Sequence, residues 1–160
     1  MSLGPGGKRT ATLPWAWAAA LVLGFAAAGG PDAQTPREQV LATVSAFFDG
    51  MASRDTLALR RLSTPDGLLH AVRADTIVGP SVTTFDDFIA SMGAARERYL
   101  ERMWEPTVLV EGPLAVVWAR YDFHRNAVFS HCGIDAILLV QSPQGWRISG
   151  IAYSVQQRGC

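Results

Sequence analysis

The sequence predicts an α+β domain in which three N-terminal helices pack on a strongly curved antiparallel sheet. Two observations lead to this prediction. Apolar residues recur at helical spacing in the first half of the domain. From about residue 98 onward the chain instead reads as long strands separated by turn-forming residues. Helices followed by a run of strands are typical of α+β folds, and a long antiparallel sheet that curls around its helices forms a cone.

The N-terminal segment predicts a secretory signal peptide. Lys8 and Arg9 form a short basic start, and an uncharged apolar run extends from Trp15 to Ala28. This run is shorter than the roughly 20 residues that span a bilayer, so a membrane anchor is the less favoured alternative. We expect a secreted or periplasmic protein with this organisation: signal peptide 1–28, linker 29–34, domain 35–160.

The charge balance argues against two classes of partner. Loss of Lys8 and Arg9 with the signal peptide reduces the 14 Lys and Arg residues to 12, against 14 Asp and Glu residues. A slightly acidic chain without a basic run lacks the clustered cations that nucleic acid requires. It also lacks a basic amphipathic helix that would hold it on a membrane surface. We therefore expect no nucleic-acid partner and no membrane association after signal cleavage.

Three helices are predicted from capping residues and apolar spacing. The first covers 36–51, where Thr35 can act as the N-cap and Glu38 completes a capping box. A second, shorter helix begins near Asp55, and Thr84 can cap a third. Each helix presents an apolar face to a common core.

The remaining segments predict turns and strands. Residues 65–67 (Pro-Asp-Gly) predict a turn, residues 68–79 predict one or two short strands, and Gly79-Pro80 ends them. Four longer strands are predicted over 98–111, 114–124, 128–141 and 145–156.

A pairing register for these strands predicts a pocket. If Arg125 and Asn126 form a two-residue turn, Arg120 lies opposite His131 and Trp118 lies opposite Gly133. One sheet face then has an apolar half and a polar half, as in a ligand pocket. We expect Asp135 and His131 as catalytic candidates and the following residues as ligand contacts: Trp118, Arg120, Asp122, Gly133, Ser154. The opposite, apolar face would be covered or would form a homodimer, and a one-residue slip would exchange the two faces.

The two cysteines, Cys132 and Cys160, suit a disulfide in an oxidising compartment. The alternative is two free thiols, one in the core and one on a frayed tail. A metal site is not expected, because two Cys without a nearby second His match no usual ligand spacing. We expect no cofactor.

Residues 108–160 resemble the NTF2-like superfamily (SnoaL-like, ketosteroid-isomerase-like), in particular secreted bacterial proteins called nuclear transport factor 2 family or lumazine-binding type. The similarity is carried by the segments 112–119, 121–123, 130–136, 145–148 and 159–160. The resemblance implies a cone-shaped α+β fold and often a homodimer. It implies no single reaction, because this superfold hosts isomerases, cyclases, dehydratases and plain binding proteins.

Three functions remain open at this stage. The leading hypothesis is binding of a small, largely apolar molecule in the cone. The second is an isomerase, cyclase or dehydratase with Asp135 as general base and His131 or Arg120 stabilising charge. His131 and Asp135 are about 13 Å apart along a strand, so they would act on different ends of a ligand. Both could instead be structural, with Asp135 paired to Arg120. The third hypothesis is an interaction module whose cone is filled by Trp104, Trp118 and phenylalanines.

Overall fold

The computed structural model describes residues 1, 4, 34–73 and 79–160. The predicted signal peptide and nearly all of the predicted linker lie outside the described residues. Residues Ala33–Cys160 form one compact unit. Within the described part of the chain, no helix is long and apolar enough to cross a membrane.

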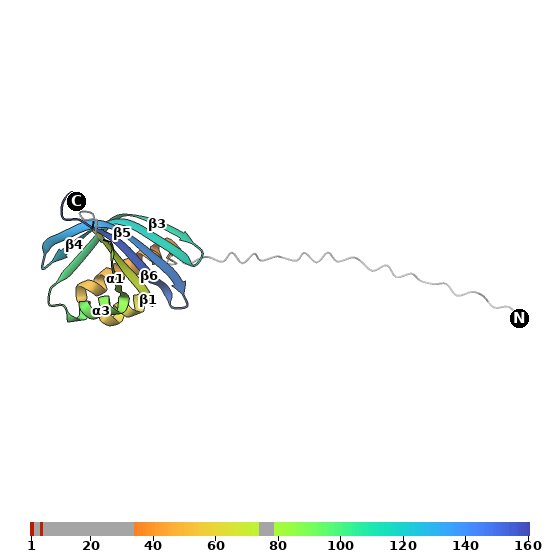
Figure 1. The fold of residues 1–160 in the computed structure, drawn as a ribbon. Coiled ribbons are helices and arrows are strands. Elements are labelled where there is room, and N and C mark those ends of the chain that lie inside the picture. Colours follow the sequence, from red (N-terminus) through yellow and green to blue (C-terminus); the bar gives the residue numbers. More distant parts are fainter. Residues whose placement is uncertain (2–3, 5–33, 74–78) are drawn as a thin grey trace. The chain divides into compact units, whose positions relative to one another are not determined.

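The unit combines three helices with one six-stranded sheet, which confirms the predicted α+β class (Figure 1). The elements are α1 (Pro36–Ser53), α2 (Thr56–Leu62), β1 (Ser63–Arg73), β2 (Ser81–Thr84), α3 (Phe85–Ala94), β3 (Tyr99–Glu111), β4 (Leu114–Arg125), β5 (Val128–Ser142) and β6 (Gly145–Val155).

The helices begin where the sequence predicts. Thr35 caps α1 by accepting a hydrogen bond from the Glu38 amide, and the Glu38 carboxylate accepts one from the Thr35 amide. Asp55 caps α2, and the Thr84 hydroxyl caps α3 by accepting a hydrogen bond from the Asp87 amide. Because each cap satisfies amides that the first helical turn leaves free, these boundaries depend on local sequence alone.

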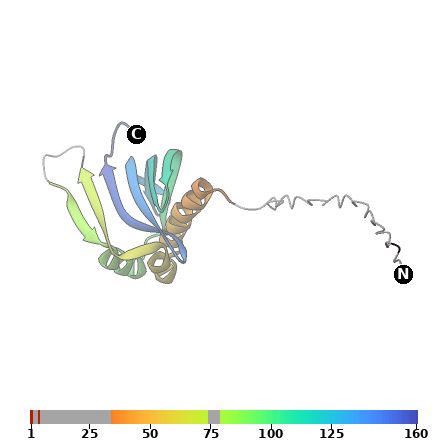
Figure 2. The same ribbon diagram turned by 90° about the vertical axis from the view of Figure 1, so that its right-hand side faces the viewer.

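The sheet has the strand order β2-β1-β6-β5-β4-β3, and its pairs are antiparallel except for β1 with β6. It curves over the helices (Figures 1 and 2). Helix α1 packs against β3 at one end of the sheet, and α3 packs against β1 and β2 toward the other. The helices therefore close the concave side and create the interior in which a pocket can form.

Two predictions about the strands are wrong. Residues 65–67 do not form a turn, because β1 runs through them with an irregularity in its pairing to β6 between Ser63 and Leu68. The β4–β5 turn is centred on Asn126 and Ala127, both of which have positive φ, as a type I′ hairpin turn requires.

A β-bulge overturns the predicted register of β4 and β5. His124 lies opposite Phe129, whereas Phe123 lies opposite His131, so Ser130 is an extra residue on β5. Arg120 therefore lies opposite Ile134, and Asp135 lies opposite Ala119. The shift moves the even-numbered residues of β4 to the outer face of the sheet.

A second bulge affects β6. The Pro143-Gln144 turn is where the sequence predicts it, and Leu139 lies opposite Ile148. Ser149 is then an extra residue, so Leu138 lies opposite Gly150 and Asp135 lies opposite Tyr153. Beyond the bulge, Ile151 and Tyr153 therefore point to the concave side.

The core lies between the concave face and the helices, and it fills the narrow end of the cone. Trp146 on β6 belongs to this core and is 6% exposed. The largest fully buried side chains come from all three helices and from β4, β5 and β6: Val40, Val44, Phe47, Leu59, Phe85, Ile89, Val117, Tyr121, Ile137, Leu139 and Ile148.

Candidate functional site

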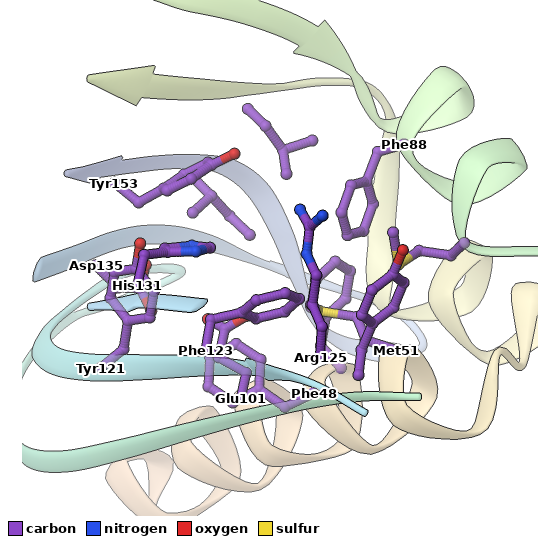
Figure 3. Close-up of a pocket in the computed structure, with 15 residues that line it drawn as sticks. Phe48, Met51, Phe88, Glu101, Tyr121, Phe123, Arg125, His131, Asp135 and Tyr153 are labelled. Carbon is purple, nitrogen blue, oxygen red and sulfur yellow. The ribbon is translucent and has the colours of Figure 1, made fainter. Parts of the chain in front are cut away.

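A cavity of about 190 Å³ opens above the core, between the concave face of the sheet and helices α1 and α3 (Figure 3). Its apolar lining comes mainly from the helices. Its polar lining comes from the strands. The apolar group is Phe47, Phe48, Met51, Leu69, Phe88, Met92, Phe123 and Ile151, and the polar group is Tyr99, Glu101, Tyr121, Arg125, His131, Asp135 and Tyr153.

Asp135 is the most buried acid at this site. It lies in the middle of β5, flanked by Ala119 on β4 and Tyr153 on β6, and its residue is only 2% exposed. Burial raises the pKa of Asp135 to about 7, because a low-dielectric surrounding disfavours the charged form. Its Oδ2 atom has no hydrogen-bond partner among the described residues. The site therefore holds an ionisable oxygen that the protein itself does not satisfy.

Glu101 on β3 also lines the pocket, within hydrogen-bonding reach of Asp135. Burial raises the pKa of Glu101 well above its usual range, and the charge of Asp135 and a hydrogen bond between the two carboxyls raise it further. The same hydrogen bond lowers the pKa of Asp135, opposing the effect of burial. A hydrogen bond between two carboxyls requires a proton on at least one of them. Near neutral pH the pair shares one proton, as closely spaced carboxyls do.

Two tyrosines flank the carboxyl pair. The Tyr121 hydroxyl donates a 2.8 Å hydrogen bond to the Ser154 carbonyl, and the ring packs edge-on against that of Tyr153 at 6.3 Å. Burial raises the pKa of both phenols, and the negative charges of Asp135 and Glu101 raise them further. Both side chains are therefore neutral. The Tyr153 hydroxyl makes no hydrogen bond to another described residue, so it remains available to a ligand.

His131 lies on the same face of β5, nearer the mouth. Its ring packs against the rings of Tyr121 and Phe123, and its Nδ1 lies 3.0 Å from the Ser130 hydroxyl. Burial lowers the pKa of His131, and the cations Arg125 and Arg73 lower it further. The imidazole is therefore neutral and can exchange a hydrogen bond. Of the residues predicted for the site, His131 and Asp135 line this pocket.

The other predicted ligand contacts lie elsewhere. Trp118 and Arg120 are exposed on the outer face of the sheet, and Asp122 is held there by an ion pair with Arg102. Arg120 therefore does not pair with Asp135. Trp104 is also exposed, so neither tryptophan fills the cone.

Gly133 and Ser154 form the back wall of the site rather than its lining. A Cβ atom on Gly133 would lie 1.9 Å from the Ser154 carbonyl oxygen, so only glycine permits this approach of β6 to β5. The Ser154 hydroxyl accepts a hydrogen bond from the Ile134 amide at 2.9 Å. The two residues fix the strand geometry that carries Tyr121 and Asp135.

The predicted disulfide between Cys132 and Cys160 is present, with Cα atoms 5.9 Å apart. Gln156, directly after β6, continues the antiparallel pairing with β5, because Cys132 and Gln156 exchange two backbone hydrogen bonds of 2.9 Å. Among the described residues, no cluster of three or more His, Cys, Asp or Glu side chains could hold a metal ion.

Sequence reasoning missed Glu101, Tyr153 and Arg125 as pocket residues. One signal was available for Glu101. Glu101 lies two residues from Tyr99 and two from Met103, so all three side chains point to the same half-buried face of β3. An acid on such a face is a candidate for a pocket residue. Tyr153 and Arg125 could not be predicted, because the β-bulges decide which face of the sheet these side chains point to.

The comparisons with known proteins bear on the fold. The sequence matches no protein-family model and no curated protein. An NTF2-like protein from Cytophaga hutchinsonii superposes with a TM-score of 0.67 at 11% identity, over 77% of this chain and 100% of that one. A protein from Streptomyces avermitilis, provisionally assigned as a dehydratase of the NTF2-like family, superposes with a TM-score of 0.61 at 19% identity. The match covers 76% of this chain and 96% of that one. An NTF2-like superfamily protein from Salmonella enterica superposes with a TM-score of 0.60 at 16% identity, over 78% of this chain and 94% of that one. The chain therefore has the NTF2-like fold.

Proposed function

We propose that the protein binds a small, largely apolar molecule whose single oxygen substituent reaches the Glu101–Asp135 pair. The observation that carries this proposal is the buried Asp135 Oδ2 without a partner, at the end of an apolar pocket. Leaving such a group unsatisfied costs about 1–3 kcal/mol, a cost that a hydroxyl or carbonyl of a ligand would remove. A cavity of about 150 Å³ already accepts benzene, so about 190 Å³ suits a molecule of one or two rings.

Fluorescence titration with 2-naphthol, and with naphthalene as its counterpart without the hydroxyl, tests this proposal. We expect 2-naphthol to bind about tenfold more tightly, because one hydrogen bond to a charged group contributes about 1.5 kcal/mol. Phe88→Trp enlarges a side chain of the pocket wall and should weaken binding. Phe129→Trp makes the same change at an exposed position outside the pocket and should not. Equal affinities for both probes, or equal effects of both substitutions, would contradict the proposal.

A second candidate function is proton transfer on the bound molecule, as in an isomerase, cyclase or dehydratase. The carboxyl pair favours it, because one member can accept a proton while the other donates one. A pKa near neutrality, as for Asp135, suits a general base that operates near pH 7. The provisional assignment of the Streptomyces avermitilis protein as a dehydratase, on the same fold, supports this class of reaction by analogy alone.

Hydrogen–deuterium exchange at the α-carbon of 2-tetralone, followed by NMR in D₂O, tests this second function. Asp135 would take the α-proton from carbon while Glu101 and Tyr153 hydrogen-bond the resulting enolate oxygen, and a deuteron would then return to carbon. We expect exchange above the buffer rate, reduced about 100-fold by Asp135→Asn with 2-naphthol binding retained. Exchange at the buffer rate in the native protein would leave binding as the function.

We further propose that the chain is secreted with cleavage after Ala28. The disulfide supports this proposal, because such bonds persist in oxidising compartments. N-terminal sequencing of the protein from a periplasmic extract should begin at Gly29, and an intact N-terminus on membrane-bound protein would favour the anchor instead.

A further inference from the structure

The mouth of the pocket carries a cation that the described part of the protein leaves without an acidic partner. Arg125 is the last residue of β4 and lines the pocket together with Tyr99 and Phe88. Figure 3 shows its side chain extending along the pocket toward Phe88. Its guanidinium makes no ion pair or hydrogen bond with another described residue. Two acids lie two residues from its strand partner Tyr99: Glu97 accepts a hydrogen bond from the Tyr99 hydroxyl, and Glu101 belongs to the carboxyl pair with Asp135.

The pocket is therefore polarised along its length. The Glu101–Asp135 pair at the inner end carries about one negative charge near neutral pH. At the mouth, Arg125 and Arg73 are both close enough to His131 to lower its pKa. Asp135 lies opposite Ala119, six residues before Arg125, which is roughly 20 Å along the strand. This is a separation of backbone positions, and the Arg125 side chain extends from its strand toward Phe88 (Figure 3).

We infer that the ligand carries a carboxylate at its outer end, held by the guanidinium of Arg125, and a neutral hydroxyl or carbonyl at its inner end. This inference rests on the proposed binding function. A guanidinium binds a carboxylate through two parallel N–H···O bonds, and the partly apolar mouth strengthens them relative to open solvent. The reverse orientation is disfavoured, because a carboxylate beside the Glu101–Asp135 pair would be repelled. The ligand class is thus a one- or two-ring hydroxy or oxo carboxylic acid.

Two pairs of probes of different length test this inference. The shorter pair is 2-naphthol and 6-hydroxy-2-naphthoate, and the longer pair is 4-phenylphenol and 4′-hydroxybiphenyl-4-carboxylate. Each acid keeps the hydroxyl and adds a carboxylate at the far end. We expect at least one acid to bind about tenfold more tightly than its neutral partner, because a charge-assisted hydrogen bond contributes about 1.5 kcal/mol or more. The preference should shrink as salt is added.

Three substitutions assign the preference to Arg125. Arg125→Gln should remove the preference for the acid over its neutral partner, and an unchanged circular dichroism spectrum shows that the variant folds. Arg125→Lys keeps the positive charge but lacks the two parallel N–H donors of a guanidinium, so it should retain part of the preference. Arg120→Gln removes an exposed arginine of the outer face and should change nothing.

The outcomes separate this inference from the function on which it rests. If the neutral probes bind and neither acid is preferred, the carboxylate assignment is wrong and the binding function stands. If an acid is preferred but Arg125→Gln keeps the preference, the assignment to Arg125 is wrong. If no probe binds, the proposed function fails and the inference fails with it.

Discussion

Asp135 occupies a position that lowers the stability of the protein. It is an acid in the interior of the cone, and burial raises its pKa to about 7. The pKa of Glu101 is raised as well. At pH values above about 4, the pair in the folded chain therefore binds more protons than the same two groups bind in the unfolded chain. Residues that cost stability in this way are typical of functional sites.

This arrangement predicts an unusual dependence of stability on pH. Because the folded state binds more protons than the unfolded state, the free energy of unfolding should fall as the pH rises from about 4 through 7. Asp135→Asn should raise the free energy of unfolding by roughly 1–3 kcal/mol at pH 8 and change it little at pH 4. Urea denaturation at both pH values measures this. The exposed Asp49→Asn should have no such effect. If the free energy of unfolding of Asp135→Asn depends on pH in the same way as that of the native protein, protonation of the pair is not coupled to folding.

The two tyrosines of the pocket should differ in their contribution to stability. Tyr121→Phe removes the hydrogen bond to the Ser154 carbonyl and should lower the free energy of unfolding by about 1–3 kcal/mol. Tyr153→Phe removes a hydroxyl that makes no hydrogen bond to another described residue, so it should cost less than 1 kcal/mol while weakening 2-naphthol binding. Thermal and urea denaturation of the two variants test this difference. Equal losses would mean that the Tyr121 hydrogen bond contributes nothing specific.

At the scale of the elements, the positions of the helices could be predicted from the sequence. The face of the sheet to which each strand side chain points could not. Thr35, Asp55 and Thr84 mark the helix starts because a cap acts within one turn of chain. The bounds of the four long strands were likewise predicted within one or two residues. Their facing depends on single extra residues, Ser130 and Ser149, and a serine within a strand gives no signal of a bulge.

The consequence for the candidate site follows directly from those bulges. Asp135 and His131 were predicted because both lie on β5, four residues apart, so their side chains share one face of the strand. This holds for any register with the neighbouring strand. Trp118 and Arg120 were assigned to the same face through a register that the Ser130 bulge changes. Glu101, Tyr153 and Arg125 were missed, since their positions in the pocket are set by the three-dimensional arrangement of the strands.

The cap of α3 provides a test at the scale of the element. Thr84→Ala removes the side chain that accepts a hydrogen bond from the Asp87 amide and should lower the free energy of unfolding by about 1 kcal/mol. Thr83→Ala, one residue earlier in β2, removes an exposed threonine that caps nothing. Similar losses in the two variants would contradict the role of Thr84 as a cap.

The disulfide joins the C-terminal tail to β5, across a sequence separation of 28 residues. Replacing both cysteines with serine should lower the free energy of unfolding by roughly 3 kcal/mol, because the unfolded chain regains the entropy that the closed loop restricts. Denaturation of the double variant, compared with the oxidised native protein, measures this loss. A change below about 0.5 kcal/mol would indicate a bond that forms in an already ordered tail.

For the whole molecule, we propose that two copies associate through the outer face of the sheet. Trp118 and Leu138 are 55% and 40% exposed there, and exposed apolar clusters of this kind are typical of interfaces. Trp118→Asp should convert a dimer to a monomer in sedimentation equilibrium. Leu57→Asp, at an exposed position of α2, should leave the assembly unchanged. A monomeric native protein at micromolar concentration would contradict this proposal.

The pocket draws its proton-bearing groups from strands and most of its apolar wall from α1 and α3. This division separates two properties that an evolving protein would otherwise have to change together. Substitutions at Phe48, Met51, Phe88 or Met92 can reshape the space for a ligand without moving Glu101 or Asp135. A lineage with this architecture can acquire new selectivity one helix residue at a time while the sheet keeps the two carboxyls in place.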